Sequence, residues 1–130
     1  LCPLVSIVYG RPTNITWRIM QMSADPNKLG IFVTSPQNMR HVLGVTQSAV
    51  RAGMKTMVFF TFKAVHLSKT PEFVKVANLC DVKDLAICAA SYQCEGYDVE
   101  DVPKGITGRQ MATQAYHGAL LEECGKYLVL

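Results

Sequence analysis

The sequence has few charged residues, no long hydrophobic run and no closely spaced pair of cysteines. Charged residues make up 18% of the chain and hydrophobic residues 49%, a composition that indicates a globular protein and excludes an intrinsically disordered one. The net charge of +3 is too small and too scattered to indicate binding to nucleic acid. No apolar run approaches the roughly 18 residues that a membrane-spanning helix needs. We therefore predict a protein that neither binds nucleic acid nor spans a membrane.

The cysteines are odd in number and show no spacing typical of a metal site. Neither C-x-x-C nor H-x-x-x-H occurs, and a glycine-rich phosphate loop is also missing, so we predict no metal and no cofactor. Five cysteines cannot all pair within one chain, and they fall among apolar residues. Both observations favour reduced thiols in the cytoplasm over the disulfide framework of a secreted protein. The five are Cys2, Cys80, Cys88, Cys94 and Cys124.

The chain is long enough for one domain with its own core, but its first 21 residues differ in pattern from the remainder. They lack a sustained helical or strand period, whereas from Met22 onward the pattern becomes orderly. We predict a poorly patterned extension over residues 1–21 and one domain over residues 22–130. An additional edge strand at Val5–Tyr9 remains an alternative for the leading segment.

Apolar runs alternate with helical patterns through the rest of the chain. Three of the runs are nearly continuous, as expected of parallel strands that are covered on both faces. The alternation predicts a three-layer α/β/α fold with a mainly parallel sheet of four to five strands. The predicted strands are Leu29–Thr34, Met57–Phe62, Leu85–Ala90 and Tyr127–Leu130.

The predicted helices have recognisable ends. Ser35 as cap and Pro36 at the first position predict the start of one helix, and Thr107 with Gln110 forms the pattern of a capping box at the start of another. Glycines end three of the four helices. The helices are predicted to run from Ser35 to Gly53, from Thr70 to about Asn78, from Ala90 to near Gly96 and from Thr107 to Gly125.

Cys88 is the strongest nucleophile at the ends of the predicted strands. In an open parallel sheet, ligands and catalytic groups collect at the carboxyl ends of the strands. Cys88 lies where the third strand gives way to a short helix, whose backbone N–H groups favour a thiolate or persulfide. A small apolar residue in a buried strand is the alternative, and the spacing alone leaves both interpretations open.

The segment Ile87-Cys-Ala-Ala-Ser-Tyr-Gln-Cys-Glu-Gly96 resembles the strand–cysteine–short helix–glycine segment of the DsrE/DsrF-like family of sulfur-relay proteins. In that pattern the sulfur-carrying cysteine lies eight residues before a glycine, as Cys88 does before Gly96. The segments Lys28–Thr34, Ala49–Gly53 and Val58–Phe62 are also similar to the first strand–helix–strand unit of the family. The resemblance covers about residues 28–130.

This resemblance implies a cytoplasmic sulfur carrier or sulfurtransferase-like protein. Cys88 would accept sulfane sulfur as a persulfide and pass it to a partner protein. The resemblance also implies a homo-oligomer, a trimer or a hexamer, with separate proteins as sulfur donor and acceptor. The alternative is a non-catalytic oligomeric or small-ligand-binding module of the same fold, in which Cys88 is inert.

Four further residues are candidates to support Cys88. Ser91 could donate a hydrogen bond to a persulfide, although helix capping explains it equally well. Cys94 could resolve an intermediate, or be a simple packed or surface thiol. His66 could serve as proton donor or charge partner, and Lys63 could attract an anionic sulfur group; for both, an ordinary surface position is the alternative.

Overall fold

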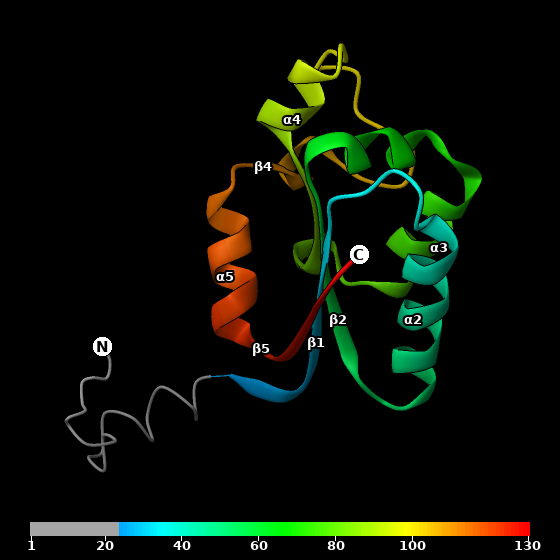
Figure 1. The fold of residues 1–130 in the computed structure, drawn as a ribbon, viewed down its shortest axis with the longest axis vertical. Coiled ribbons are helices and arrows are strands. Elements are labelled where there is room, and N and C mark those ends of the chain that lie inside the picture. The colour runs from blue at the N-terminus through cyan, green and yellow to red at the C-terminus, as the bar shows by residue number, and fades with distance from the viewer. Residues whose placement is uncertain (1–23) are drawn as a thin grey trace, which may run out of the picture.

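Five parallel strands form the central sheet of the computed structural model, which describes residues 24–130 (Figure 1). The strand order is β4-β3-β2-β1-β5, and every pair of neighbours is parallel. The predicted α/β fold class is therefore confirmed. The strands are β1 (Asp25–Val33), β2 (Lys55–Phe60), β3 (Leu85–Cys88), β4 (Met111–Ala112) and β5 (Cys124–Val129).

Helices cover the sheet on both faces and at one end. Figure 1 shows α5 on one face, α2 and α3 on the other, and α4 beyond the carboxyl ends of the strands. The helices are α2 (Met39–Arg51), α3 (Pro71–Leu79), α4 (Ala89–Cys94) and α5 (Ala115–Glu123). Three 3₁₀ segments connect them: η1 (Phe62–Lys69), η2 (Val82–Asp84) and η3 (Gly108–Gln110).

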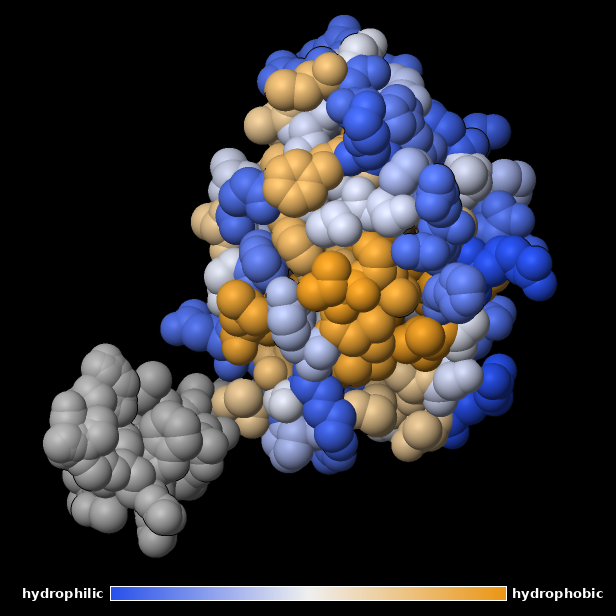
Figure 2. All heavy atoms as spheres, viewed as in Figure 1, coloured by the Kyte–Doolittle hydropathy of each residue, from blue (hydrophilic) through white to orange (hydrophobic). Residues whose placement is uncertain are grey.

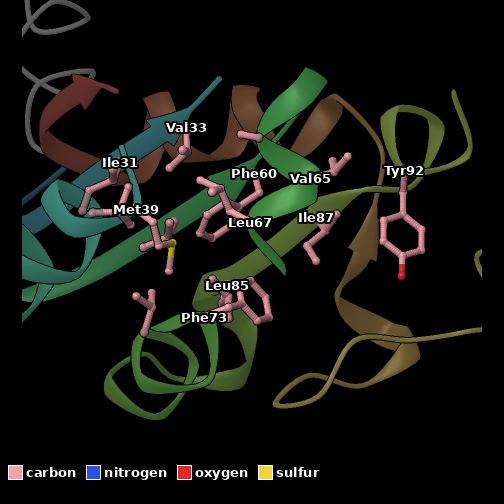
Figure 3. Close-up of a cluster of buried hydrophobic side chains, with 14 residues drawn as sticks. Ile31, Val33, Met39, Phe60, Val65, Leu67, Phe73, Leu85, Ile87 and Tyr92 are labelled. Atoms are coloured by element: carbon pink, nitrogen blue, oxygen red, sulfur yellow. The ribbon is translucent and has the colours of Figure 1, made fainter. Parts of the chain in front are cut away.

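The core has two parts, one on each face of the sheet. The larger part lies under α2 and α3, where the Phe60 and Phe73 rings pack edge to face with centroids 5.3 Å apart (Figure 3). The smaller part lies under α5 and includes Cys88 and Leu120. A Cβ atom at Gly30 would lie only 2.5 Å from Leu120 Cδ2, so this glycine allows α5 to approach β1 closely.

The first helix begins later than predicted. Thr70 and Pro71 do open α3 as expected, but α2 starts at Met39 and not at Ser35. The Ser35 hydroxyl accepts a hydrogen bond from the backbone N–H of Gln37 over 3.3 Å. Such a local bond stabilises a turn in place of a helix.

The capping box at Thr107 belongs to a different element from the one predicted. The Thr107 backbone N–H donates to Gln110 Oε1 over 2.9 Å, and the pair caps η3. The chain then forms β4, which pairs with the end of β3, and α5 begins only at Ala115. Gly125 does not end this helix; it lies within β5.

The predicted domain boundary at Met22 and the alternative strand at Val5–Tyr9 lie outside the described residues. Within residues 24–130, no helix is both long and apolar enough to cross a membrane.

Candidate functional site

Cys88 lies at the carboxyl end of β3, where two other segments meet the segment that contains it. It is the residue that precedes α4, and it pairs with Ala112 of β4. Thr61 follows β2, the neighbour of β3, and Gln114 directly precedes α5. The parallel topology thus brings residues 61, 88–91 and 114 together at the carboxyl ends of the strands. Ligand-binding and catalytic sites of open parallel sheets lie at this end.

The Cys88 sulfur is contacted by hydrogen-bond donors. The backbone N–H of Ser91 donates to Cys88 Sγ over 3.5 Å, and the Gln114 side-chain amide donates to it over 3.4 Å. These are long, weak contacts of the kind that a thiol accepts and a thiolate strengthens.

Thr61 connects these groups to one another. Its hydroxyl lies 3.2 Å from the Ser91 hydroxyl and accepts a hydrogen bond from the Gln114 amide. The Ser91 hydroxyl also accepts from the backbone N–H of Phe62 over 3.0 Å. Phe62 has a φ of 52°, a left-handed conformation unfavourable for a bulky residue, and this hydrogen bond helps to hold it there.

The network favours the thiolate form of Cys88. Burial by itself raises the pKa of Cys88, since the residue is only 1% exposed, but hydrogen bonds from Ser91, Thr61 and the Ala90 backbone outweigh it. The pKa of Cys88 is therefore lowered from the ordinary cysteine value of 9.0. The pKa falls because these hydrogen bonds stabilise the thiolate more than the neutral thiol.

Two other cysteines, the buried Cys124 and the half-buried Cys80, lie in different surroundings. Burial raises the pKa of Cys124 to about 11, and it raises the pKa of Cys80 to about 11 as well, although the Thr56 hydroxyl lies 3.3 Å from Cys80 Sγ. Among the cysteines of residues 24–130, Cys88 alone combines burial with a lowered pKa.

Of the predicted supporting residues, the structure brings Ser91 to Cys88 and places His66 and Lys63 in another cluster. His66 Nε2 lies 2.7 Å from Glu95 Oε1, and His66 Nδ1 lies 2.7 Å from the Tyr97 hydroxyl. Lys63 is exposed, with its Nζ 3.7 Å from the same Glu95 oxygen. The hydrogen bond from His66 lowers the pKa of Glu95, with Lys63 contributing. This cluster connects η1 to the far end of α4.

Cys94 lies at that far end too, and it is exposed. Six residues of helix separate two Cα atoms by about 9 Å, more than the roughly 7 Å limit for a disulfide. A bond between Cys88 and Cys94 would therefore require α4 to change its conformation.

Two residues of the site were not predicted from the sequence as participants. Thr61 lies at a strand end whose importance could be foreseen, but its hydroxyl was not distinguished from its neighbours. No local sequence pattern indicates a role for Gln114, because its contact with Cys88 joins residues that are 26 positions apart. Within residues 24–130, no group of three or more histidine, cysteine or acidic side chains is arranged to hold a metal ion.

Comparison of the chain with protein-family models, with curated proteins and with solved structures found no significant match.

Proposed function

We propose that this chain is a cytoplasmic sulfur carrier, or sulfurtransferase-like protein, in which Cys88 accepts sulfane sulfur as a persulfide and passes it to a partner. The observation that carries the proposal is the ring of donors around Cys88. Ser91 and Gln114 donate hydrogen bonds to Cys88 Sγ, the Thr61 hydroxyl helps to lower the pKa of the thiol, and all three groups are neutral.

The loading step is a thiol–persulfide exchange without net oxidation. The Cys88 thiolate attacks the outer sulfur of a donor persulfide R–S–SH, the donor S–S bond breaks, and R–S⁻ leaves as the new S–S bond forms on Cys88. Delivery to an acceptor thiolate repeats the same exchange in reverse, with Cys88 thiolate as leaving group. A lowered pKa of Cys88 assists both steps, since it raises the thiolate fraction and improves the leaving group.

Mass spectrometry after incubation with glutathione persulfide tests this function. We expect an adduct of about 32 Da, the mass of one sulfur atom, on the peptide that contains Cys88. Cys88→Ser should abolish the adduct at that peptide, whereas Cys94→Ser, which removes an exposed thiol from the same short helix, should leave it. An adduct found on the other cysteines but not on Cys88 would refute the proposal.

The proposal includes a homo-oligomer, a trimer or hexamer, together with donor and acceptor proteins. The exposed edge strand β5 supports self-association. Figure 2 shows a hydrophobic patch in the middle of the face on which Figure 1 draws β5, and Tyr127 and Val129 of this strand are 40% and 53% exposed. Light scattering at micromolar concentration should report a mass of three or six chains; a monomer would contradict this part.

One observation favours the second candidate, a non-catalytic or small-ligand-binding module with an inert Cys88. The residue is 1% exposed, as a structural cysteine would be. If so, Cys88 should be the slowest thiol to react with a small alkylating reagent in the folded protein.

A further inference from the structure

Gln114 is the exposed member of the hydrogen-bond network around the Cys88 sulfur. The other groups of the network are more deeply placed: Thr61 is 0% exposed, and Ser91 is half-buried. Gln114 is an exposed residue, yet its side-chain amide reaches inward to both Cys88 Sγ and Thr61 Oγ1. Its outer side faces solvent while its inner end contacts the reactive atom.

The helix that follows Gln114 does not depend on its side chain for a cap. Gln114 precedes α5, but its side chain does not cap the helix. The backbone N–H of Ala115 instead donates to the hydroxyl of Thr113 over 3.3 Å. The Gln114 side chain is therefore not used as a helix cap, and its amide donates to Thr61 and to Cys88.

We propose that Gln114 is a movable cover for Cys88, which donates a hydrogen bond to the sulfur at rest and swings away to admit the sulfur donor. This inference rests on the proposed function and names the residue that regulates access to its site. The movement requires a change of side-chain rotamer and the loss of two hydrogen bonds, to Cys88 and to Thr61. Exposed side chains change rotamer on a timescale of picoseconds to nanoseconds.

The cover has two effects with opposite consequences for reactivity. The hydrogen bond from the amide stabilises the thiolate, which increases the fraction of reactive sulfur at neutral pH. The position of the side chain blocks approach to the sulfur, which lowers the rate at which the thiolate reacts. The pH dependence of alkylation separates the two, since its midpoint reports the pKa and its high-pH limit reports access.

Three charged or titratable groups on the surrounding elements contact residues other than Cys88. Lys63 and His66 of η1 pair with Glu95, which follows α4, and His117 of α5 stacks on Phe32 with ring centroids 3.8 Å apart. Arg109 lies in η3, before β4. The midpoint at Cys88 is therefore expected to depend on the neutral donors more than on these groups.

Iodoacetamide alkylation of Cys88 over a range of pH, followed on its peptide by mass spectrometry, tests the cover. Gln114→Ala removes both the obstacle and the donor. We expect the limiting rate constant at high pH to rise about tenfold, because the two hydrogen bonds of the Gln114 amide no longer have to break, and we expect the midpoint to move upward. An unchanged or lower limiting rate constant would overturn the proposal.

Gln114→Glu separates the two roles, because it keeps the size of the side chain but replaces the donor amide with an anion. The midpoint should rise by more than in Gln114→Ala, while the limiting rate constant should stay near that of the parent protein. A limiting rate constant raised as much as in the alanine variant would show that side-chain bulk does not govern access, and would overturn the cover.

Gln47→Ala is the matched control, since Gln47 is an exposed glutamine on α2, across the sheet from α5 (Figure 1). It should change neither quantity, and the thermal unfolding transition of each variant verifies folding. Alkylation needs no persulfide, so the cover can be upheld even where the sulfur adduct fails to form on Cys88. An adduct that forms while Gln114→Ala leaves access unchanged would refute the cover alone.

Discussion

The sheet buries polar side chains at both of its ends, and the two ends balance them differently. At the amino ends of the strands, Lys28 Nζ lies 2.9 Å from Asp84 Oδ1 and 3.2 Å from Glu123 Oε1, and the Lys28 and Asp84 side chains are 7% and 3% exposed. At the carboxyl ends, Cys88 lies beside the neutral groups of Ser91, Thr61 and Gln114, of which Ser91 and Gln114 donate hydrogen bonds to its sulfur.

The difference separates stability from reactivity. At the amino end each buried charge has an opposite charge beside it. These ion pairs stabilise the fold and leave no reactive group. At the carboxyl end the donors surround a group that is neutral until it loses a proton, and they favour that loss. The two ends therefore predict different results when a polar partner is removed: a less stable protein in one case, a less reactive sulfur in the other.

The largest expected effect is at the amino end. Lys28→Met leaves the buried Asp84 carboxylate without its closest cation, and breaking a buried pair in this way costs about 3–5 kcal/mol. Urea unfolding should show a correspondingly lower free energy of unfolding. The double variant Lys28→Met, Asp84→Leu should recover most of the loss, because no unpaired charge remains. A double variant less stable than Lys28→Met would contradict this explanation.

A smaller effect on stability, but a clear one on reactivity, is expected for Thr61→Val. The change keeps the shape of the side chain and removes the hydroxyl that connects Ser91 and Gln114, at a cost of about 1–2 kcal/mol. The pKa of Cys88 should rise, since the Thr61 hydroxyl is one of the groups that lower it. Alkylation at neutral pH should slow accordingly.

Thr46→Val is the control for this comparison. Thr46 is equally buried, and its hydroxyl donates to the Val42 carbonyl within α2 over 2.7 Å. Its loss should cost a similar free energy of unfolding but leave the alkylation rate of Cys88 unchanged. If alkylation of Cys88 slowed equally in both variants, the cause would be a general loss of stability and not the loss of the hydrogen-bond network around Cys88.

The smallest effect concerns alkaline stability. Burial lowers the pKa of Lys28, but hydrogen bonds and charges from Asp84 and Glu123 outweigh it and raise the pKa above 10.5. Because the folded pKa exceeds the unfolded one, this stabilisation is fully present below about pH 10.5 and is lost as the pH rises through the folded pKa. Relative to the double variant, the parent protein should lose stability there. If the free energies of unfolding of the two proteins changed in parallel above pH 10.5, Lys28 would not be the source of the alkaline loss of stability.

Local patterns sufficed for most of the fold. The continuous apolar runs predicted β1, β2 and β3, because a strand buried on both faces has to be apolar throughout. The short strand β4 was missed, since Met111 and Ala112 are defined by their pairing with Ile87 and Cys88 and have no pattern of their own. Predicting it requires knowledge of a contact between distant residues.

The same limit applies to the site. Cys88 could be identified from the strand end, and Ser91 from the helix turn directly after it. His66 was expected near Cys88 because it follows β2, but η1 carries it to Glu95 and Tyr97. Gln114 was invisible because only the tertiary structure brings the start of α5 to the end of β3.

The most direct test of the account compares two buried cysteines of the parent protein in one experiment. Iodoacetamide alkylation is measured across pH for the peptides that contain Cys88 and Cys124. We expect the midpoint for Cys88 to lie below 9.0 and that for Cys124 to lie near 11, as the lowered and raised pKa values of the two thiols require. A midpoint for Cys88 that coincides with that of Cys124 would contradict a thiolate-stabilising site at the carboxyl end of the sheet.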